Sequence, residues 1–223
     1  MIISILISLS FLLMCASFAY LSHEDFTGDN LSQKIKNAIH KNIKVLIYNI
    51  CAFVLMIALS FTLIKLYKSN TLIADMKIIT LMAILVTVAV TDIRKQIIPN
   101  KIILIGIVFR VLYAVAELIT LGSGYFSILK SDLLSLGLTF AMFLLGVLVV
   151  KNGIGMGDIK LIMLIGIFQG LSGVIGSLFF SLLTSFVIAI VMLITRKKTR
   201  KDSMEFAPAV LFGTVLSMFL TGM

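Results

Sequence analysis

The sequence predicts an all-α protein, a polytopic bundle of about eight transmembrane helices with both termini outside. Hydrophobic residues make up 60% of the 223 residues and charged residues only 13%, and the mean hydropathy is +1.16. A soluble domain is about 45–50% apolar and about 25% charged, so a water-soluble fold is excluded. The apolar runs are long and continuous rather than alternating, which favours helices over the strands of a barrel.

Eight apolar segments follow one another along the chain. Most are long enough to cross a hydrocarbon core of about 30 Å at a rise of about 1.5 Å per residue, and only two prolines interrupt the chain. The segments are 1–21, 44–66, 72–91, 102–121, 132–150, 159–170, 172–194 and 206–222. We expect them to form a single integral membrane domain, residues 1–223.

Local signals mark where several segments begin or end. Asp92 ends segment 72–91, and Pro99-Asn100 opens segment 102–121, because proline fits the first turn of a helix. Segment 159–170 is short, since twelve residues give only about 18 Å of helix. It meets a turn-like cluster, Gln169-Gly170-Leu171-Ser172-Gly173. Either the helix continues through these glycines, or segments 159–170 and 172–194 form a hairpin that stops partway.

The distribution of Lys and Arg predicts the orientation. Fourteen of the 19 basic residues lie in the loops 22–44, 92–101, 151–160 and 195–201. Lys and Arg accumulate in cytoplasmic loops, which places these four loops in the cytoplasm and both termini outside. The net charge of +9 then needs no nucleic-acid partner, and we expect a multi-pass protein of the cell inner (cytoplasmic) membrane.

The N-terminal region is expected to stay with the protein as a helix. Ser17-Phe18-Ala19 is similar to a signal-peptide cleavage site, but no basic residue precedes it, since the first is Lys34. Loop 22–44 reads as a short capped amphipathic helix on the membrane surface. Cys15 and Cys51 lie in apolar runs and are expected to be small packing residues, because two such thiols make neither a disulfide framework nor a zinc site.

Two aspartates at cytoplasmic segment ends are the candidate catalytic residues. Asp92 lies at the negative end of a helix dipole, which is unfavourable by about 0.3–1 kcal/mol; its alternative role is a loop carboxylate paired with Arg94 or Lys95. Asp158 follows three alternating glycines, Gly153, Gly155 and Gly157. Its alternative role is an N-cap, which does not explain the glycines, residues that let a backbone approach another chain closely.

Together the two aspartates predict a carboxylate dyad. The two histidines, His23 and His40, lie in loop 22–44, so no Ser–His or Cys–His pair and no metal ligand set is expected, and no cofactor. Two neighbouring carboxylates cannot both ionise cheaply and share one proton. One then activates a water while the other donates to a carbonyl oxygen. The helix dipoles favour Asp158 as the base and Asp92 as the acid.

Three sequence blocks resemble the type IV prepilin peptidases, membrane aspartyl proteases of the GxGD class. Gly155-Met156-Gly157-Asp158-Ile159-Lys160-Leu161 resembles their GxGD block, with Gly166 and Gly170 after it. Asp92 with Pro99 and Asn100 resembles the first catalytic block. Glu205-Phe206-Ala207-Pro208, followed by Gly213, resembles the C-terminal block. The resemblance covers about 85–220, the expected peptidase core, and leaves 1–84 as N-terminal helices with loop 22–44.

The resemblance implies a catalytic pair, Asp92 and Asp158, supported by Gly155, Gly157, Lys160, Pro99, Asn100 and Pro208. It implies cleavage of the basic leader of a pilin-like or pseudopilin-like precursor at the cytoplasmic face of the bilayer. Larger members of the family carry a cytosolic zinc-binding domain with CxxC pairs, associated with N-methylation. Loop 22–44 contains no cysteine, so we expect a peptidase without methyltransferase activity.

Other readings stay open at this point. Glycine-broken helices with an acid at the break are also typical of transporters, so a transporter or binding-only membrane protein is the alternative function; a presenilin-like protease is another. Arg110 and Glu117, seven residues apart on one helix face, are expected to form a mutual or a cross-helix ion pair inside the bundle rather than to act in catalysis. Lys160 either acts on Asp158 or faces lipid headgroups. Asp202 and Glu205, or the two catalytic aspartates themselves, are candidate partners of a basic leader. Arg196 to Lys201 are expected to anchor the chain at the membrane.

Overall fold

The computed structural model describes residues 2–22, 47, 50–51, 53–54, 57–58, 71–149, 155–195 and 205–221. Within these ranges the protein is all-helical and contains no strand, which confirms the predicted fold class. The elements are α1 (Ile2–Ser22), α4 (Leu72–Lys95), α5 (Asn100–Leu121), the 3₁₀ helix η2 (Gly122–Gly124), α6 (Tyr125–Val149), α7 (Met156–Ile194) and α8 (Ala207–Thr221).

Three helical stretches of the described chain are long and apolar enough to cross a membrane: Leu72–Lys95, Asn100–Met142 and Met156–Ile194. The second stretch includes the turn between α5 and α6, and the third includes both arms of α7. Many large apolar side chains of α5 and α7 are exposed, as expected for helices that face lipid rather than water. The protein is therefore a membrane protein.

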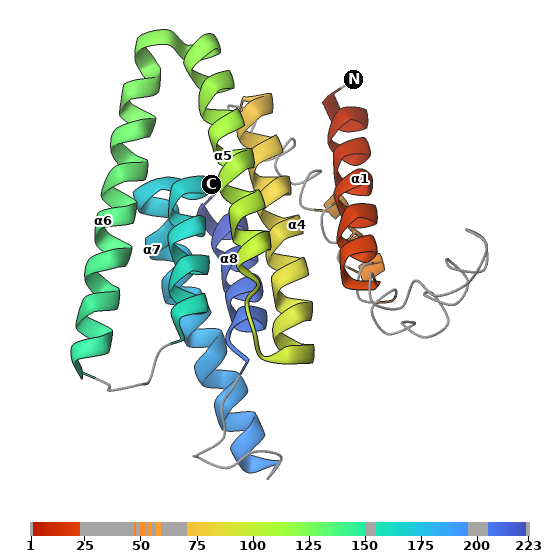
Figure 1. The fold of residues 1–223 in the computed structure, drawn as a ribbon, viewed down its shortest axis with the longest axis vertical. Helices are drawn as coiled ribbons and strands as arrows, with labels where there is room; N and C mark the ends of the chain where they lie inside the picture. Colours follow the sequence, from red (N-terminus) through yellow and green to blue (C-terminus); the bar gives the residue numbers. More distant parts are fainter. Residues whose placement is uncertain are drawn as a thin grey trace.

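Helix α4 forms the centre of the bundle. Every residue from Ile78 to Asp92 is buried, because α1, α5, α7 and α8 all pack against it. Its Leu81, Leu85 and Val88 are fully buried in one core cluster with residues of α7 and α8. Figure 1 shows α4 running beside α5 and α8, with α1 on its outer side. The ends of α4 therefore set the positions of the residues around them.

Helices α5 and α6 run in opposite directions and are joined by a tight turn (Figure 1). Gly122 has a positive φ of 54°, a conformation that glycine adopts without steric cost. Helix α6 begins at Tyr125, seven residues before the predicted start of segment 132–150. The prediction was late because Lys130 and Asp132 lower the local hydropathy, although Asp132 is buried and paired inside the bundle.

Helix α7 is a hairpin, so the second of the two sequence-based alternatives is correct. Gly170 breaks the helix with φ 69° and ψ −170°. Ser177 Oγ donates to Gln169 Oε1 at 2.6 Å, although residues eight apart in a continuous helix are separated by about 12 Å. The arm before Gly170 and the arm after it therefore lie side by side, and Figure 1 shows them folded back between α5 and α6.

Helix α8 packs closely against the second arm of α7. A Cβ atom added at Gly213 would lie 2.3 Å from the backbone nitrogen of Ser181, a distance that no side chain can occupy. Predicted segments 1–21, 102–121 and 206–222 match α1, α5 and α8 closely, whereas α4 continues four residues past the predicted end at Thr91.

Several predictions fall outside the described residues. These include loop 22–44 with its amphipathic helix, most of segment 44–66, Gly153, the basic run Arg196 to Lys201 and Asp202. The number of eight membrane segments and the location of both termini therefore stay predictions.

Candidate functional site

Asp92 lies inside helix α4 rather than in a loop, one turn before the helix ends at Lys95. Its side chain is only 7% exposed. The backbone N–H of Ala207 donates to Asp92 Oδ2 at 3.0 Å. A residue 115 positions later in the chain thus holds the carboxyl group in place.

This contact follows from where α8 begins. The first helical hydrogen bond of α8 runs from Val210 N–H to Phe206 C=O at 3.0 Å, so Ala207 carries one of the N–H groups that have no partner within the helix. Such N–H groups form the positive end of a helix dipole and bind anions. Asp92 therefore lies at the negative end of α4 and the positive end of α8. The dipole argument that made Asp92 the acid no longer decides which aspartate holds the proton.

Asp158 is the third residue of α7, and the N-cap is Gly155. The N-cap role considered for Asp158 is therefore wrong. Its carboxyl group instead reaches back and accepts a hydrogen bond from the backbone of Gly155, as the third residue does in a capping box. A Cβ atom at Gly155 would lie 2.9 Å from Asp158 Oδ2. Glycine at 155 is needed because any side chain would displace this carboxyl group.

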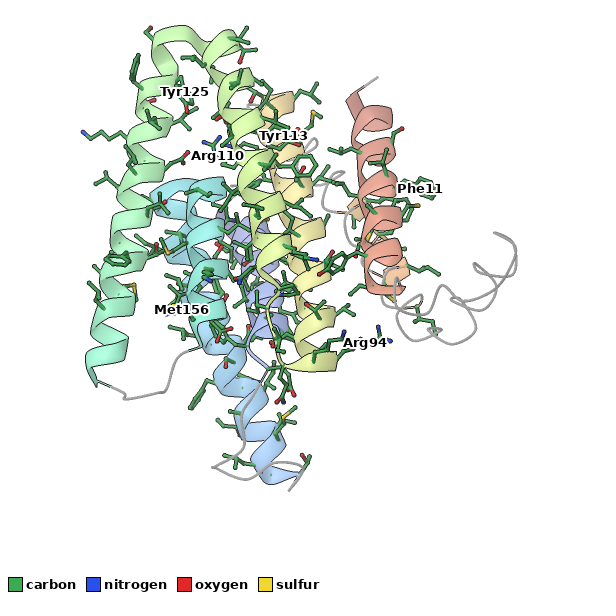
Figure 2. The ribbon with its side chains drawn as sticks, viewed as in Figure 1. Phe11, Arg94, Arg110, Tyr113, Tyr125 and Met156 are labelled. Carbon is green, nitrogen blue, oxygen red and sulfur yellow. The ribbon has the colours of Figure 1, made fainter. Side chains whose placement is uncertain are left out.

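The negative charge of Asp92 acts on the partly buried carboxyl group of Asp158. The two aspartates are therefore within electrostatic range of each other, at the same end of the bundle. Figure 2 labels Arg94, two residues after Asp92, and Met156, two residues before Asp158, in the lower half of the molecule, whereas Arg110 and Tyr113 lie in the upper half.

The segment between α4 and α5 closes the site against α7. A Cβ atom at Gly157 would lie 2.9 Å from Ile98 Cβ, so glycine permits this close approach. Pro99 is the N-cap of α5 rather than a residue of its first turn. Lys160 Nζ donates to Asn100 Oδ1 at 2.9 Å in an exposed contact. Lys160 thus ties α7 to the start of α5.

The structure brings most of the predicted site residues to one place. Around Asp92 and Asp158 lie Gly155, Gly157, Pro99, Asn100 and Lys160, and Pro208 is in the first turn of α8 beside Ala207. Sequence reasoning missed Ala207, whose contribution is a backbone N–H and not a side chain. It also missed the hydrogen bond from Gln96 Nε2 to Glu205 Oε1 at 3.0 Å. The block Glu205 to Pro208 was the signal for both.

Among the described residues, no group of three or more His, Cys, Asp and Glu could hold a metal ion. The two histidines lie outside these residues.

Comparison with known proteins gives two matches. The type IV leader peptidase family matches residues 79–194, a range that contains both aspartates. A protein of Bacillus subtilis (strain 168) named prepilin leader peptidase/N-methyltransferase is 31% identical over 140 residues, which are 62% of this chain and 53% of that protein. The chain thus matches about half the length of this relative. No solved structure matches the chain. Since the family match covers more than half of the sequence and contains both aspartates, the chain belongs to the type IV leader peptidase family.

Proposed function

We propose that this protein is a membrane aspartic endopeptidase that removes the basic leader of type IV pilin-like precursors at the cytoplasmic face of the inner membrane. The observation that carries the proposal is the pairing of two aspartates from different helices at one end of the bundle, with the charge of Asp92 acting on Asp158. Family membership supports the reaction class. The transporter alternative is not favoured, because the chain belongs to a family of leader peptidases.

The proposed mechanism uses one proton shared by the two carboxyl groups. The ionised aspartate takes a proton from a water molecule, whose oxygen attacks the carbonyl carbon of the scissile amide. The protonated aspartate donates its proton to the carbonyl oxygen, so a tetrahedral intermediate forms without a free charge on that oxygen. A proton then passes from the first aspartate to the amide nitrogen. The C–N bond breaks and the amine leaves, while the second aspartate takes a proton from a hydroxyl group of the intermediate, which gives the new carboxyl group and restores the shared proton.

The hydrogen bonds around the site support this chemistry by holding both carboxyl groups. Ala207 N–H fixes one oxygen of Asp92, and the Gly155 backbone binds Asp158. Preorganised groups of this kind need no rearrangement as the reaction proceeds. Because the two acids lie at helix ends, the proposal places them near the membrane surface, where water is present, whereas the hydrocarbon core contains none.

A basic leader would meet the carboxyl group of Glu205 near the two aspartates, since Glu205 accepts a hydrogen bond from Gln96, just after the end of α4. Glu205 lies two residues before the start of α8, whose first N–H binds Asp92. We propose that Glu205 and Asp202 attract the leader, while the hydrophobic helix of the precursor stays in the bilayer. This arrangement requires the predicted topology of eight membrane segments, with the aspartate end in the cytoplasm and both termini outside.

We further propose that the chain cleaves without methylating the product. The absence of cysteine from loop 22–44 is the basis, since a zinc site with CxxC pairs cannot form there.

The test is leader cleavage by membranes that contain this protein, mixed with a pilin-like precursor and read by mass spectrometry. Asp92→Asn and Asp158→Asn should each lower the cleavage rate by about 10²–10⁴-fold, the usual contribution of an acid or base. Asp75→Asn is the matched control, because Asp75 is a buried aspartate at the opposite end of α4. Cleavage that survives either active-site substitution, at equal protein level, would contradict the dyad. A product heavier by one methyl group would contradict the absence of methylation.

A further inference from the structure

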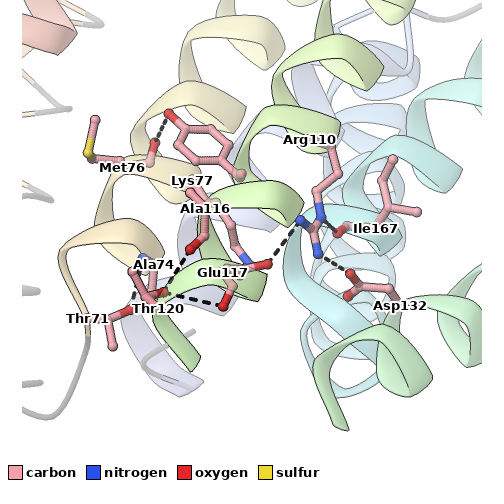
Figure 3. Close-up of polar contacts among 11 residues, drawn as sticks. Thr71, Ala74, Met76, Lys77, Arg110, Ala116, Glu117, Thr120, Asp132 and Ile167 are labelled. Carbon is pink, nitrogen blue, oxygen red and sulfur yellow. Dashed lines mark hydrogen bonds and ion pairs between the residues drawn. The ribbon is translucent and has the colours of Figure 1, made fainter. Parts of the chain in front are cut away.

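A second cluster of charged residues lies in the half of the bundle away from the two aspartates. Arg110 on α5 donates through Nη1 to Glu117 Oε2 at 3.1 Å and through Nη2 to Asp132 Oδ2 on α6. Lys77 Nζ on α4 donates to Glu117 Oε1 at 2.6 Å. Figure 3 shows the Arg110 guanidinium between Glu117 and Asp132. The predicted ion pair of Arg110 and Glu117 is therefore confirmed, within a larger cluster.

The cluster is balanced and shielded. Its four side chains are between 4% and 12% exposed, and two cations face two carboxylates. An unpaired charge at such a position would be very costly, whereas a neutral set with satisfied hydrogen bonds is tolerated. Membrane proteins retain buried charges mainly where the charges have a function.

The cluster also binds the tip of the α7 hairpin. Arg110 Nε donates to the backbone carbonyl of Ile167 at 2.6 Å, three residues before the break at Gly170, and Figure 3 shows this contact. On the other side of the break, Leu171 N–H donates to Ser131 Oγ of α6 at 3.0 Å. Backbone groups at a helix break need partners from outside the helix, and here α5 and α6 supply them.

Arg110 suits this task better than any other cation. Its guanidinium presents N–H groups in a rigid fork, so it binds two carboxylates and a carbonyl at once. Lys77 balances the second carboxylate. The tip is thereby connected to α4, α5 and α6 together.

The arm that leads from the tip to the candidate active site is a helix. Twelve residues separate Gly170 from Asp158, which corresponds to about 18 Å. Because the arm is a rigid rod, the position of its tip affects the position of its base, where Gly157 touches Ile98.

We propose that Arg110, with Lys77, Glu117, Asp132 and Ser131, clamps the tip of the α7 hairpin and so positions Asp158 opposite Asp92. The effect on catalysis, through the position of Asp158, rests on the proposed peptidase function. The attachment of the hairpin tip to α5 and α6 does not depend on that function. Arg110 and Ser131 are positioning residues, since they act through the helix and not on the substrate.

Disulfide formation at the base of the hairpin measures this positioning without any substrate. Ile98→Cys and Gly157→Cys place two thiols next to each other, in a chain where Cys15→Ala and Cys51→Ala remove the native thiols. The added Cβ at 157 would lie 2.9 Å from the Cβ at 98, and a disulfide needs about 3.5–4.5 Å, so the bond forms after a small outward shift of the base. A base that moves further away forms it more slowly, and the initial rate under a mild oxidant therefore reports how closely the base is held.

Arg110→Lys and Ser131→Ala test the clamp in this background. The first keeps the charge but loses the fork, and the second keeps all four charges but loses the bond to Leu171. Ser127→Ala is the matched control, because Ser127 lies on the same helix and its hydroxyl donates to Gly124 C=O, away from α7. Both clamp variants should form the disulfide at least about threefold more slowly than the control, since the tip is released.

Leader cleavage is measured separately, in chains without the added cysteines. Arg110→Lys should lower kcat for leader cleavage by about 10–100-fold, because a shift of about 1 Å in a catalytic group has an effect of this size. KM should stay within about twofold, since the leader does not touch the cluster. Poor folding of a variant is a different effect, because it would lower the amount of active enzyme and the disulfide yield of that variant together.

The outcomes separate the clamp from the peptidase proposal. Unchanged disulfide rates in the clamp variants that reach the membrane would overturn the clamp, whatever their activity. Slower disulfide formation with unchanged kcat would also overturn it, because Asp158 would then not depend on the tip. If the parent chain cleaves no precursor, the peptidase proposal fails, while the disulfide rates still decide whether the tip is held by these residues.

Discussion

Ala207 and Asp92 are joined by a hydrogen bond from the backbone of one helix start to the side chain of another helix end, at 3.0 Å. Asp92 comes from α4 and Ala207 is the first residue of α8. The bond fixes one carboxyl oxygen of Asp92, Oδ2, against the start of α8. Position 207 therefore contributes its backbone N–H to the candidate site, and the type of side chain at this position does not indicate that contribution.

Ala207→Pro tests this contact. Proline is well accommodated at the first position of a helix and lacks an N–H, so the substitution removes the donor. Because Ala207 is fully buried, the thermal midpoint of the variant in detergent checks that α8 still packs in place. A hydrogen bond to a charged group contributes about 1.5–3 kcal/mol, so cleavage should fall by about 10–100-fold, measured as kcat/KM for leader removal. Ala207→Gly retains the N–H and should cleave within about threefold of the parent. Equal rates for the two variants would exclude a role for the N–H.

Gly155→Ala tests the space beside Asp158. The backbone at 155 has φ −68°, which suits alanine, so no backbone strain arises. The new Cβ would lie 2.9 Å from Asp158 Oδ2 and would displace the carboxyl group, which should lower kcat by about 10²-fold. Gly137→Ala on α6 is the control, because nothing lies within 4 Å of its added Cβ. A Gly155→Ala protein as active as this control would show that the close contact is unimportant.

Gly213→Ala tests the packing of α8 on α7. The added Cβ would lie 2.3 Å from the backbone nitrogen of Ser181, and a backbone atom cannot move aside as a flexible side chain can. Overpacking of this kind costs about 1–3 kcal/mol, so the thermal midpoint in detergent should fall. The substitution should also weaken cleavage, since α8 carries Ala207. An unchanged midpoint would mean that the two helices separate without cost.

Lys160→Met distinguishes two roles for Lys160: the hydrogen bond to Asn100, and an action of its charge on Asp158. Its bond to Asn100 is exposed, and exposed polar contacts contribute little. We therefore expect leader cleavage within about threefold of the parent, at pH values on both sides of neutrality. A change in the shape of the pH–rate profile would show instead that the ammonium group acts on Asp158. Asn100→Ala removes the same bond but keeps the charge, so the two variants separate the bond from the charge.

The α7 hairpin shows why part of the fold was out of reach of the sequence. The glycines at 170 and 173 indicated an interruption, but glycine permits a continued helix as well as a reversal. The direction is determined by Arg110 and Ser131, which bind the backbone on either side of Gly170. These residues are on other helices, so no local pattern contains the answer.

The ion cluster could likewise be predicted only in part from the sequence. Arg110 and Glu117 are seven residues apart on one helix, and their pairing was predicted from that spacing. Asp132 and Lys77 complete the cluster from α6 and α4, and their membership depends on how three helices pack. Asp132 even lowered the local hydropathy enough to hide the first two turns of α6.

The sequence by itself determined that the chain is a helical membrane protein and that Asp92 and Asp158 are its candidate catalytic groups, because hydropathy, glycine spacing and motif order are local properties. Only the tertiary structure decided that α7 turns back at Gly170, that Asp158 is held by Gly155 rather than serving as the N-cap, and that the start of α8 binds Asp92. Each of these depends on which backbone and side-chain groups satisfy one another across the bundle. Buried polar groups must find partners, and in this protein those partners come from distant parts of the chain.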